Sequence, residues 1–236
     1  MISIDNMIES LEKILANSPY SISYEIIDNS HIKLTSLGTA SHAAHPNLGK
    51  NAISPMIIIL YNLFDSYHIH LSLLDYFVTY IGDDFTGKKL GIDFEDESGE
   101  LTLNTAQFIL KENILSLGFN LRIPVTIDYS IIKDKFQNHC TENLTIEVVR
   151  VQDPLLIKKT NPLVQKLCAI FNDYNHSQLP PEAIGGGTYA RAFDNCISFG
   201  PQMPGAKDMC HQSNEYISID NLLFCTKVYA QAILDL

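Results

Sequence analysis

The first part of the chain alternates between two hydrophobic periods. Apolar residues spaced three and four apart across residues 6–18 predict an amphipathic helix, with Met7, Ile8, Leu11, Ile14 and Leu15 on one face. Residues 20–38 alternate between apolar and polar on either side of a turn-forming Asp-Asn-Ser, which predicts a β-hairpin. Residues 51–67 and 70–82 are apolar over most of their length, so we expect a pair of buried helices there.

The middle of the chain returns to the strand period. Residues 99–126 hold two alternating stretches around Lys-Glu-Asn, which predict a second β-hairpin. A short helix is expected over 130–139 and a strand over 143–152. Helices and hairpins in this order predict an α+β domain over residues 1–152, with a ferredoxin-like antiparallel sheet covered by helices on one face.

The pattern changes after about residue 153. A helix over 162–175, a glycine-rich loop, a short strand over 196–200 and a final helix over 218–236 predict part of an α/β layer. Two helices and one or two short strands can hardly bury both faces of a sheet, because a small domain buries only a small share of its surface. We therefore expect residues 153–236 to expose a large apolar face or to bury it by association.

The composition limits the classes of partner. Hydrophobic residues make up 46% of the 236 residues and charged residues 18%, as in a globular protein with a buried core. The net charge of -11, from 16 basic and 27 acidic residues, disfavours nucleic acid because a phosphate backbone requires clustered Lys and Arg. Small molecules or proteins are the expected partners.

The cysteines, the N-terminus and the apolar runs together predict a cytoplasmic protein. The cysteines are widely spaced and contain no Cys-x-x-Cys pair, which predicts neither a disulfide framework nor a cysteine-based zinc site; they are Cys140, Cys168, Cys196, Cys210 and Cys225. The N-terminus is polar and acidic, unlike a secretion signal, and the longest apolar run, 55–64, is too short to cross a bilayer. We therefore expect a cytoplasmic protein without a membrane partner.

Three stretches carry side chains or backbone groups suited to chemistry. His42 and His45 lie in a predicted loop before a buried helix, and they could share a metal ion only if that loop curls. Arg122 lies on a predicted strand, where a guanidinium either binds a carboxylate bidentately or points to water at a sheet edge. Residues 184–191 place three glycines before a predicted helix, so their backbone N–H groups could bind an anion.

The glycine run and His211 are weak signals when each is taken alone. The glycines lack the Lys-Ser/Thr ending of a phosphate loop and the Gly-x-Gly-x-x-Gly spacing, so a nucleotide-binding domain is the least favoured interpretation. His211 lies in "MCHQSNEYI", residues 209–217. A lone histidine is more often an ordinary hydrogen-bonded side chain than a metal ligand, since a metal site needs three or four ligands.

Four motifs in a fixed order are far more specific than any one of them. "GTASHAAHP" followed by "GKNA", then "NLRIPV", "IGGGTYAR" and "HQSNE" resemble the co-catalytic zinc peptidases, the family that includes aminoacylases and carnosinase-like dipeptidases. Within that family the chain most resembles bacterial Xaa-His dipeptidases of the peptidase V type. The resemblance extends from the first predicted helix to the last.

The resemblance implies a fold and a role for individual residues. Residues 1–152 resemble a lid domain that lacks its first strand, and residues 153–236 resemble the C-terminal part of an α/β catalytic domain. His42 corresponds to the lid histidine that stabilises the oxyanion, Arg122 to the arginine that binds the substrate's terminal carboxylate, and His211 to a zinc ligand. The other residues implied in substrate binding are Asn51, Gly185, Gly186 and Gly187.

Most of the metal ligands that the resemblance implies have no counterpart in this sequence. The family holds two zinc ions with a His-x-Asp pair, a bridging Asp and a Glu-Glu pair whose first Glu is the general base, but neither His-x-Asp nor Glu-Glu occurs here. One histidine cannot activate a water between two metal ions. We therefore expect the C-terminal portion of a zinc dipeptidase for small peptides, inactive alone, which self-associates or pairs with a missing N-terminal half. The alternative is a non-catalytic, lid-derived module that binds a peptide or a protein.

Overall fold

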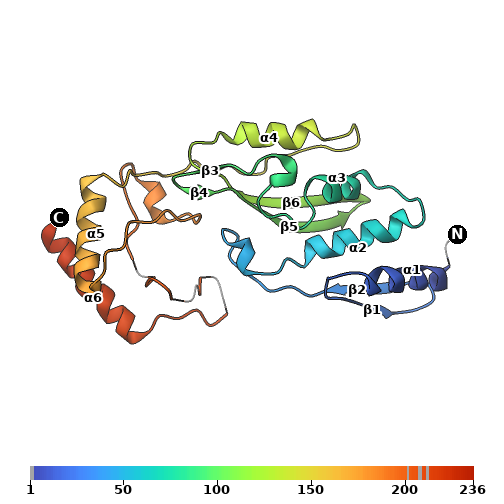
Figure 1. Cartoon of the computed structure of the whole chain (residues 1–236), viewed down its shortest axis with the longest axis horizontal. Coiled ribbons are helices and arrows are strands. Elements are labelled where there is room, and N and C mark those ends of the chain that lie inside the picture. Colours follow the sequence, from blue (N-terminus) through green and yellow to red (C-terminus); the bar gives the residue numbers. More distant parts are fainter. Residues whose placement is uncertain (1–2, 201, 207–208, 211–212) are drawn as a thin grey trace. The chain divides into compact units, whose positions relative to one another are not determined.

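The chain forms two compact units, Met1–Val151 and Gln152–Leu236 (Figure 1). The computed structural model describes residues 3–200, 202–206, 209–210 and 213–236. Each unit has a hydrophobic core of its own. Across the described residues, none of the helices is long and apolar enough to cross a membrane.

The first unit begins with a helix packed on a β-hairpin. Helix α1 (Ile4–Ala16) starts where the Ser3 hydroxyl accepts a hydrogen bond from Asn6 N, as an N-cap serine does. Strands β1 (Ile22–Ile26) and β2 (Ile32–Ser36) pair antiparallel. The inward side chains of the hairpin pack with α1 around buried Leu11, Ile59 and Leu63. The helix and the hairpin predicted from the two hydrophobic periods are both confirmed.

Helix α2 (Ile53–Asp65) lies between two cores. Ile59 and Leu63 pack with α1 and the β1–β2 hairpin, whereas Ile57 packs into the main core of the unit. A helix that is covered on more than one side is apolar over most of its surface. This explains why residues 51–67 show little periodicity in the sequence.

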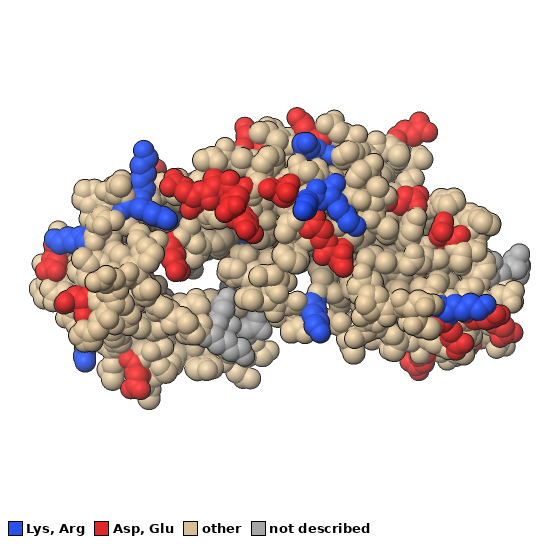
Figure 2. Space-filling model, viewed as in Figure 1, with Lys and Arg blue, Asp and Glu red and all other residues tan. Residues whose placement is uncertain are grey.

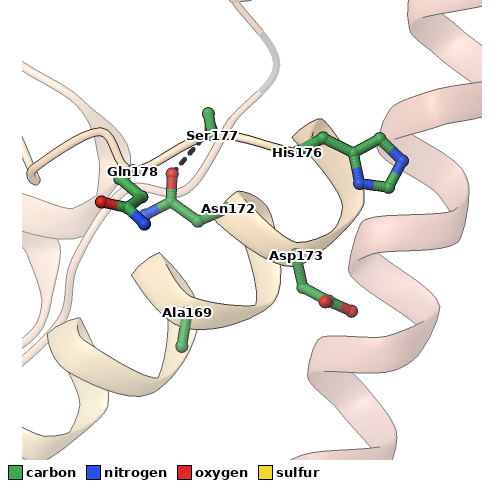
Figure 3. Close-up of a pocket in the computed structure, with 6 residues that line it drawn as sticks. All are labelled: Ala169, Asn172, Asp173, His176, Ser177 and Gln178. Carbon is green, nitrogen blue, oxygen red and sulfur yellow. Dashed lines mark hydrogen bonds between the residues drawn. The ribbon is translucent and has the colours of Figure 1, made fainter.

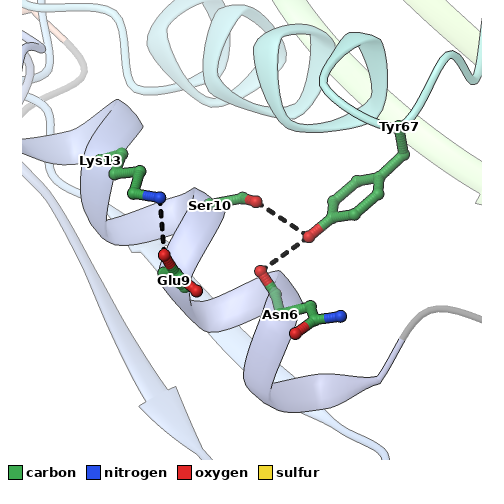
Figure 4. Close-up of polar contacts among 5 residues, drawn as sticks. All are labelled: Asn6, Glu9, Ser10, Lys13 and Tyr67. Carbon is green, nitrogen blue, oxygen red and sulfur yellow. Dashed lines mark hydrogen bonds and ion pairs between the residues drawn. The ribbon is translucent and has the colours of Figure 1, made fainter.

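A tyrosine beyond α2 fastens the two helices together. The Tyr67 hydroxyl donates to Asn6 O at 2.7 Å and shares a 2.9 Å hydrogen bond with Ser10 Oγ, both on α1 (Figure 4). On the same helix Lys13 Nζ lies 2.6 Å from Glu9 Oε1, but this pair is exposed. An exposed ion pair contributes little to stability, so packing and the tyrosine hydrogen bonds hold α1 in place.

The main core lies between three helices and one face of a hairpin. Helices α2, α3 (Ser72–Tyr80) and α4 (Tyr129–Asn138) pack on strands β5 (Thr102–Lys111) and β6 (Ile114–Arg122). The buried side chains come from these elements and from the loop before β5: Ile57, Leu74, Tyr76, Phe77, Ile81, Leu90, Ile92, Leu101, Leu103, Ile132 and Phe136. The predicted arrangement, with helices on one face of antiparallel strands, is therefore present at this hairpin. The single ferredoxin-like sheet predicted for residues 1–152 is not formed by the described residues, because β1 and β2 pair in a sheet of their own.

The residues of β5 that face the core change once along the β5–β6 hairpin. A register shift between Thr105 and Gln107 inserts one residue into β5, so its inward-facing positions change from odd to even numbers. The connecting turn holds Glu112 at φ 51° and Asn113 at φ 64°. Two successive left-handed residues give the turn the twist that its strands require.

The strands form three separate two-stranded sheets within the described residues. β1 pairs with β2, β3 (Glu95–Asp96) with β4 (Gly99–Glu100), and β5 with β6. The strand predicted over 143–152 is wrong, because these residues join no sheet. Leu144 and Ile146 do pack against the main core. The alternation therefore marks which side chains are buried, whereas a strand also needs a partner for its backbone hydrogen bonds.

The second unit is built from two helices and long loops. Helices α5 (Pro162–Asn175) and α6 (Ile219–Asp235) pack on each other through buried Leu167, Ile170, Val228 and Ala232. Both helices were predicted and are confirmed. The strand predicted over 196–200 is wrong. Its apolar residues Ile197 and Phe199 pack against the helix pair instead, since the described part of this unit contains no strand to pair with.

Helix α6 carries apolar residues on two opposite faces. At 100° per residue, Phe224, Val228 and Ala232 lie on the face that packs with α5. The opposite face presents large aliphatic side chains that are 51–80% exposed: Ile219, Leu222, Leu223, Ile233 and Leu234. A helix that is apolar on both faces is typical of the interior of a larger assembly. The large apolar face predicted for this part of the chain is therefore present in the unit.

Candidate active site

The loop that carries His42 joins β2 to α2 and is closed at its base. Thr39 and Lys50 exchange two backbone hydrogen bonds, each 2.9 Å long. Between them lie a 3-10 turn, Pro46–Leu48, and a tight turn in which His45 N donates to His42 O at 2.8 Å. The loop therefore curls into a ring, and its two histidines share one turn.

His42 is half-buried, and a backbone hydrogen bond holds the Nδ1 side of its ring. Nδ1 accepts a hydrogen bond from Ala44 N at 3.2 Å. In a neutral imidazole the other nitrogen then carries the proton, so Nε2–H is a hydrogen-bond donor. A fixed neutral donor of this kind can stabilise an oxygen that becomes negative during a reaction.

Arg122 ends β6 on the face of the hairpin that lies away from the main core. Its two sequence neighbours pack into that core, and successive side chains of a strand point to opposite faces. Arg122 is half-buried and pairs across the ladder with Thr102. Thr102 Oγ1 donates to Ala43 O at 3.5 Å, next to His42. The first unit thus brings the loop with His42 and the strand end with Arg122 to one end of the hairpin.

Asn51 joins the end of this loop to two elements, α2 and β5. Its Oδ1 accepts from Ile53 N at 2.8 Å and from Ser54 N at 3.1 Å, at the start of α2. Its Nδ2 donates to Asn104 Oδ1 at 3.2 Å and to Thr105 O at 2.8 Å on β5. These four bonds use both donors and both lone pairs of the amide. The substrate-binding role predicted for Asn51 stays a prediction beside this structural one.

Asp96 fixes the segment that follows Arg122. Its Oδ1 accepts from the backbone N and the hydroxyl of Ser98 at 2.7 and 2.6 Å. Its Oδ2 accepts from the backbone N and the hydroxyl of Thr126, both at 2.8 Å. Partial burial raises the pKa of the Asp96 carboxyl, but these donors outweigh that effect and lower the pKa to about 2. The carboxylate thereby anchors the chain just beyond the end of β6.

This lowered pKa predicts a stability loss in acid. The folded pKa of Asp96, about 2, lies below the usual 3.8, so its contribution is complete above about pH 4 and is lost as the pH falls through 2. Because the carboxyl is only partly buried and is screened by solvent, we expect a loss on the order of 1 kcal/mol. Urea unfolding at pH 4 and at pH 2 should show a smaller difference for Asp96→Asn than for the parent. Asp93→Asn, at an exposed position, is the control and should behave like the parent. An equal change in stability between pH 4 and pH 2 for Asp96→Asn and the parent would contradict the prediction.

The other predicted site residues belong to the second unit. Gly185 and Gly187 are exposed and Gly186 is half-buried. The helix predicted after them is wrong, because only one 3-10 turn, Tyr189–Ala192, follows. So short a turn offers no aligned helix N-terminus to an anion. His211 lies outside the described residues, and its role as a metal ligand stays a prediction.

A shallow hollow at the C-terminal end of α5 has polar walls but no candidate chemistry (Figure 3). It is lined by Ala169, Asn172, Asp173, His176, Ser177 and Gln178. Asn172 Oδ1 accepts from Ser177 Oγ at 2.8 Å and from Leu179 N at 2.9 Å. His176 ends the helix in the left-handed conformation, at φ 49°. The polar groups of Asn172 and Ser177 therefore serve to end α5 and hold the next loop.

Acidic side chains predominate over basic ones on the face shown in Figure 2. Five acidic residues lie within eight positions around the β3–β4 turn: Asp93, Glu95, Asp96, Glu97 and Glu100. Among the described residues, no three His, Cys, Asp or Glu side chains are arranged to hold a metal ion. These acidic residues therefore form no metal site in the described part of the chain, and His42 and His45, with ring centroids 6.2 Å apart, are two potential ligands without a described third.

Comparison with known sequences decides the family. Residues 9–235 match the sequence profile of peptidase family M20/M25/M40. The chain belongs to this family. The resemblance predicted from the four motifs is thereby confirmed.

Two relatives of this M20 family chain carry related names. It is 37% identical over 216 residues to the Bacillus subtilis (strain 168) protein named "Putative dipeptidase YtjP". It is 31% identical over 215 residues to the Staphylococcus aureus (strain MW2) protein named "Putative dipeptidase MW1694". Each alignment covers 89% of this chain but 45% of the relative. The chain thus spans about half the length of the curated relatives it matches.

Two groups that support the candidate site were missed by sequence reasoning. Asp96 could have been found, because Asp-x-Ser at residues 96–98 is a signal for a side chain that accepts from the backbone two residues later. Thr102 gives no such signal. Its contact with Ala43 depends on the strand register and on how the loop folds back.

Proposed function

We propose that this chain is the C-terminal portion of a zinc dipeptidase of the M20 family. Residues 1–152 would act as the substrate-covering lid and residues 153–236 as part of the catalytic domain. The observation that carries the proposal is the contact from Thr102 to Ala43, which brings the loop with His42 to the strand end with Arg122. An N–H donor and a guanidinium suit the two negative groups of a dipeptide under attack, its oxyanion and its terminal carboxylate.

In the proposed reaction, the two side chains act at different stages. Arg122 binds the terminal carboxylate of the dipeptide, in the substrate and in the transition state alike. His42 donates from Nε2–H to the carbonyl oxygen only as that oxygen becomes negative. Because the loop of His42 and the strand of Arg122 belong to one folded unit, the distance between their groups would be fixed, as binding both ends of one short peptide requires.

The metal would be held mainly by groups outside this chain. The family resemblance assigns His211 as the one zinc ligand here, and no three-ligand group occurs among the described residues. When bound, a pair of zinc ions would supply a water of lowered pKa as the nucleophile. Gly185, Gly186 and Gly187 would line the pocket with backbone groups. We therefore propose that the chain alone does not hydrolyse dipeptides.

A second polypeptide would complete the enzyme, and the exposed face of α6 is the surface we assign to it. That face, which includes Leu222 and Leu234, is apolar and long enough to require a cover. The relatives are about twice as long as the part that aligns with this chain. A polypeptide equivalent to the remaining part of those relatives is therefore the proposed occupant, in preference to a second copy of the chain.

Mixing the two parts tests the proposed function. The chain is combined, with zinc, with the part of the Bacillus subtilis relative that it does not match, and dipeptide hydrolysis is measured. We expect turnover by the mixture and by neither part alone. Leu222→Lys with Leu234→Lys should prevent both association and turnover, whereas Ser23→Lys, on the outward face of β1, should leave both intact. A stable one-to-one complex that hydrolyses no dipeptide would contradict the proposed function, and a dimer of the chain through α6 would contradict the proposed partner.

A further inference from the structure

Backbone hydrogen bonds and two closely packed glycines hold the base of the loop that carries His42. The hydrogen bonds between Thr39 and Lys50 close it at the base. Gly38 and Gly49 flank that closure, and each has other atoms where a side chain would begin. A Cβ at Gly38 would lie 2.5 Å from Lys50 O, and one at Gly49 would lie 2.5 Å from Ser41 Oγ. Both positions therefore require glycine for the ring to close.

Closing the ring does not by itself fix the direction in which the loop points. Two contacts tie it to β5. One is the 3.5 Å hydrogen bond from Thr102 Oγ1 to Ala43 O, next to His42. The other is the amide of Asn51, which directly follows Lys50 and donates to Asn104 and to Thr105 O. The Asn51 contacts are shorter and one of them reaches the backbone of β5, so they dominate the attachment.

We propose that Asn51 is a positioning residue that holds the loop of His42 at a fixed place relative to Arg122. This inference rests on the proposed function, in which the two side chains contact opposite ends of one dipeptide. Asn51 Nδ2 fastens the base of the loop to β5, and Arg122 pairs with Thr102 on that strand. Asn51 Oδ1 fastens the same base to α2. Loss of the link to β5 would let the loop turn without unfolding the unit.

A shift of the loop should act on catalysis rather than on substrate binding. An oxyanion donor is effective only within a few tenths of an ångström of its productive position. A misplacement of about 1 Å can cost on the order of 10²-fold in rate. Arg122 keeps its place on β6 whether or not the loop moves, so its contribution to KM should persist.

Asn51→Asp separates the two roles of the amide. The aspartate keeps an oxygen for Ile53 N and Ser54 N, because Asp caps a helix as well as Asn does, but it cannot donate to β5. Asn51→Ala removes both roles and should also destabilise α2. Asn17→Asp is the matched control, since Asn17 Nδ2 donates to Lys13 O at 2.9 Å in the same unit, on another helix.

Hydrogen exchange on the chain alone tests the structural half of this inference. We expect Asn51→Asp to raise exchange at the amides of Thr39, Ala44 and Lys50 by about 10-fold or more. The reason is that the free energy of local opening falls by at least roughly the contribution of one hydrogen bond between uncharged groups. Exchange in the β1–β2 hairpin should stay unchanged, and the thermal midpoint should fall by only a few degrees. Asn17→Asp should leave exchange at the three loop amides unchanged. Unchanged exchange at all three loop amides would overturn the inference.

Kinetics of the mixture with the complementary part test the functional half. Asn51→Asp should lower kcat roughly 10- to 100-fold with KM within about twofold of the parent, and Asn17→Asp should change neither. A mobile loop with an unchanged kcat would overturn the positioning role. So would a rise in KM as large as the fall in kcat, which is the result that the substrate-binding role predicted for Asn51 implies. A parent mixture without turnover would refute the proposed function, while the exchange data would still decide whether Asn51 fixes the loop.

Discussion

His42→Ala is expected to lower kcat by about 10²–10³-fold in the complex of this chain with the complementary part, which is the usual effect of removing one oxyanion donor. The physical reason is the timing of the hydrogen bond. Its donor, Nε2–H, is set by the bond from Ala44 N to Nδ1, and the acceptor oxygen becomes negative only in the transition state. KM should therefore change little.

His45→Ala is the matched control for this substitution. His45 lies in the same turn, with its ring centroid 6.2 Å from that of His42, but it is exposed and has no proposed role. We expect the control to keep kcat within about twofold of the parent. A folded His42→Ala protein with unchanged kcat would contradict the oxyanion role, and equal losses in both variants would indicate a general disturbance of the loop.

Arg122→Ala is expected to raise KM about 10- to 100-fold and to leave kcat nearly unchanged. A hydrogen-bonded charged pair contributes about 1.5–3 kcal/mol, and here it would be formed equally in the substrate and in the transition state. Steady-state kinetics with a dipeptide and with the corresponding dipeptide amide provide the measurement. The amide lacks the carboxylate, so the parent enzyme should bind it more weakly.

The paired substrates make this prediction specific. Once Arg122 is removed, the dipeptide and its amide should show similar KM values, because the group that distinguishes them is gone. Arg122→Lys should recover part of the preference, since an ammonium keeps the charge but not the bidentate geometry. If Arg122→Ala continues to prefer the free carboxylate, another residue binds that group.

The sequence predicted the elements whose signal is local. All the predicted helices except the one after the glycine run are present, because their apolar residues recur with the helical period or, over 51–67 and 70–82, form long apolar runs. Caps such as Ser3 and Ser218 mark where two of them start. Both hairpins are present because each joins two alternating stretches through a turn. The strands predicted over 143–152 and 196–200 are absent, because alternation reports the burial of side chains such as Ile146 and Phe199 and says nothing of a backbone partner.

The candidate site, too, could be predicted only in part. His42 and Arg122 were chosen from motifs that resemble a known family, and the fold brings their segments together through Thr102 and Ala43. That meeting point could not be read from the sequence, since it depends on the register of β5 and β6. The attachment of Asn51 to Thr105 O was equally hidden, because Thr105 lies at the irregular point of the ladder.

Dipeptide hydrolysis by the purified chain alone, with zinc supplied, tests the central claim most directly. The account predicts no turnover above the background, because the proposed roles give this chain an oxyanion donor, a carboxylate-binding arginine and one zinc ligand, His211. The general base and the remaining ligands would come from a second polypeptide. Zinc-dependent turnover by the chain alone that disappears in His211→Ala would contradict the account.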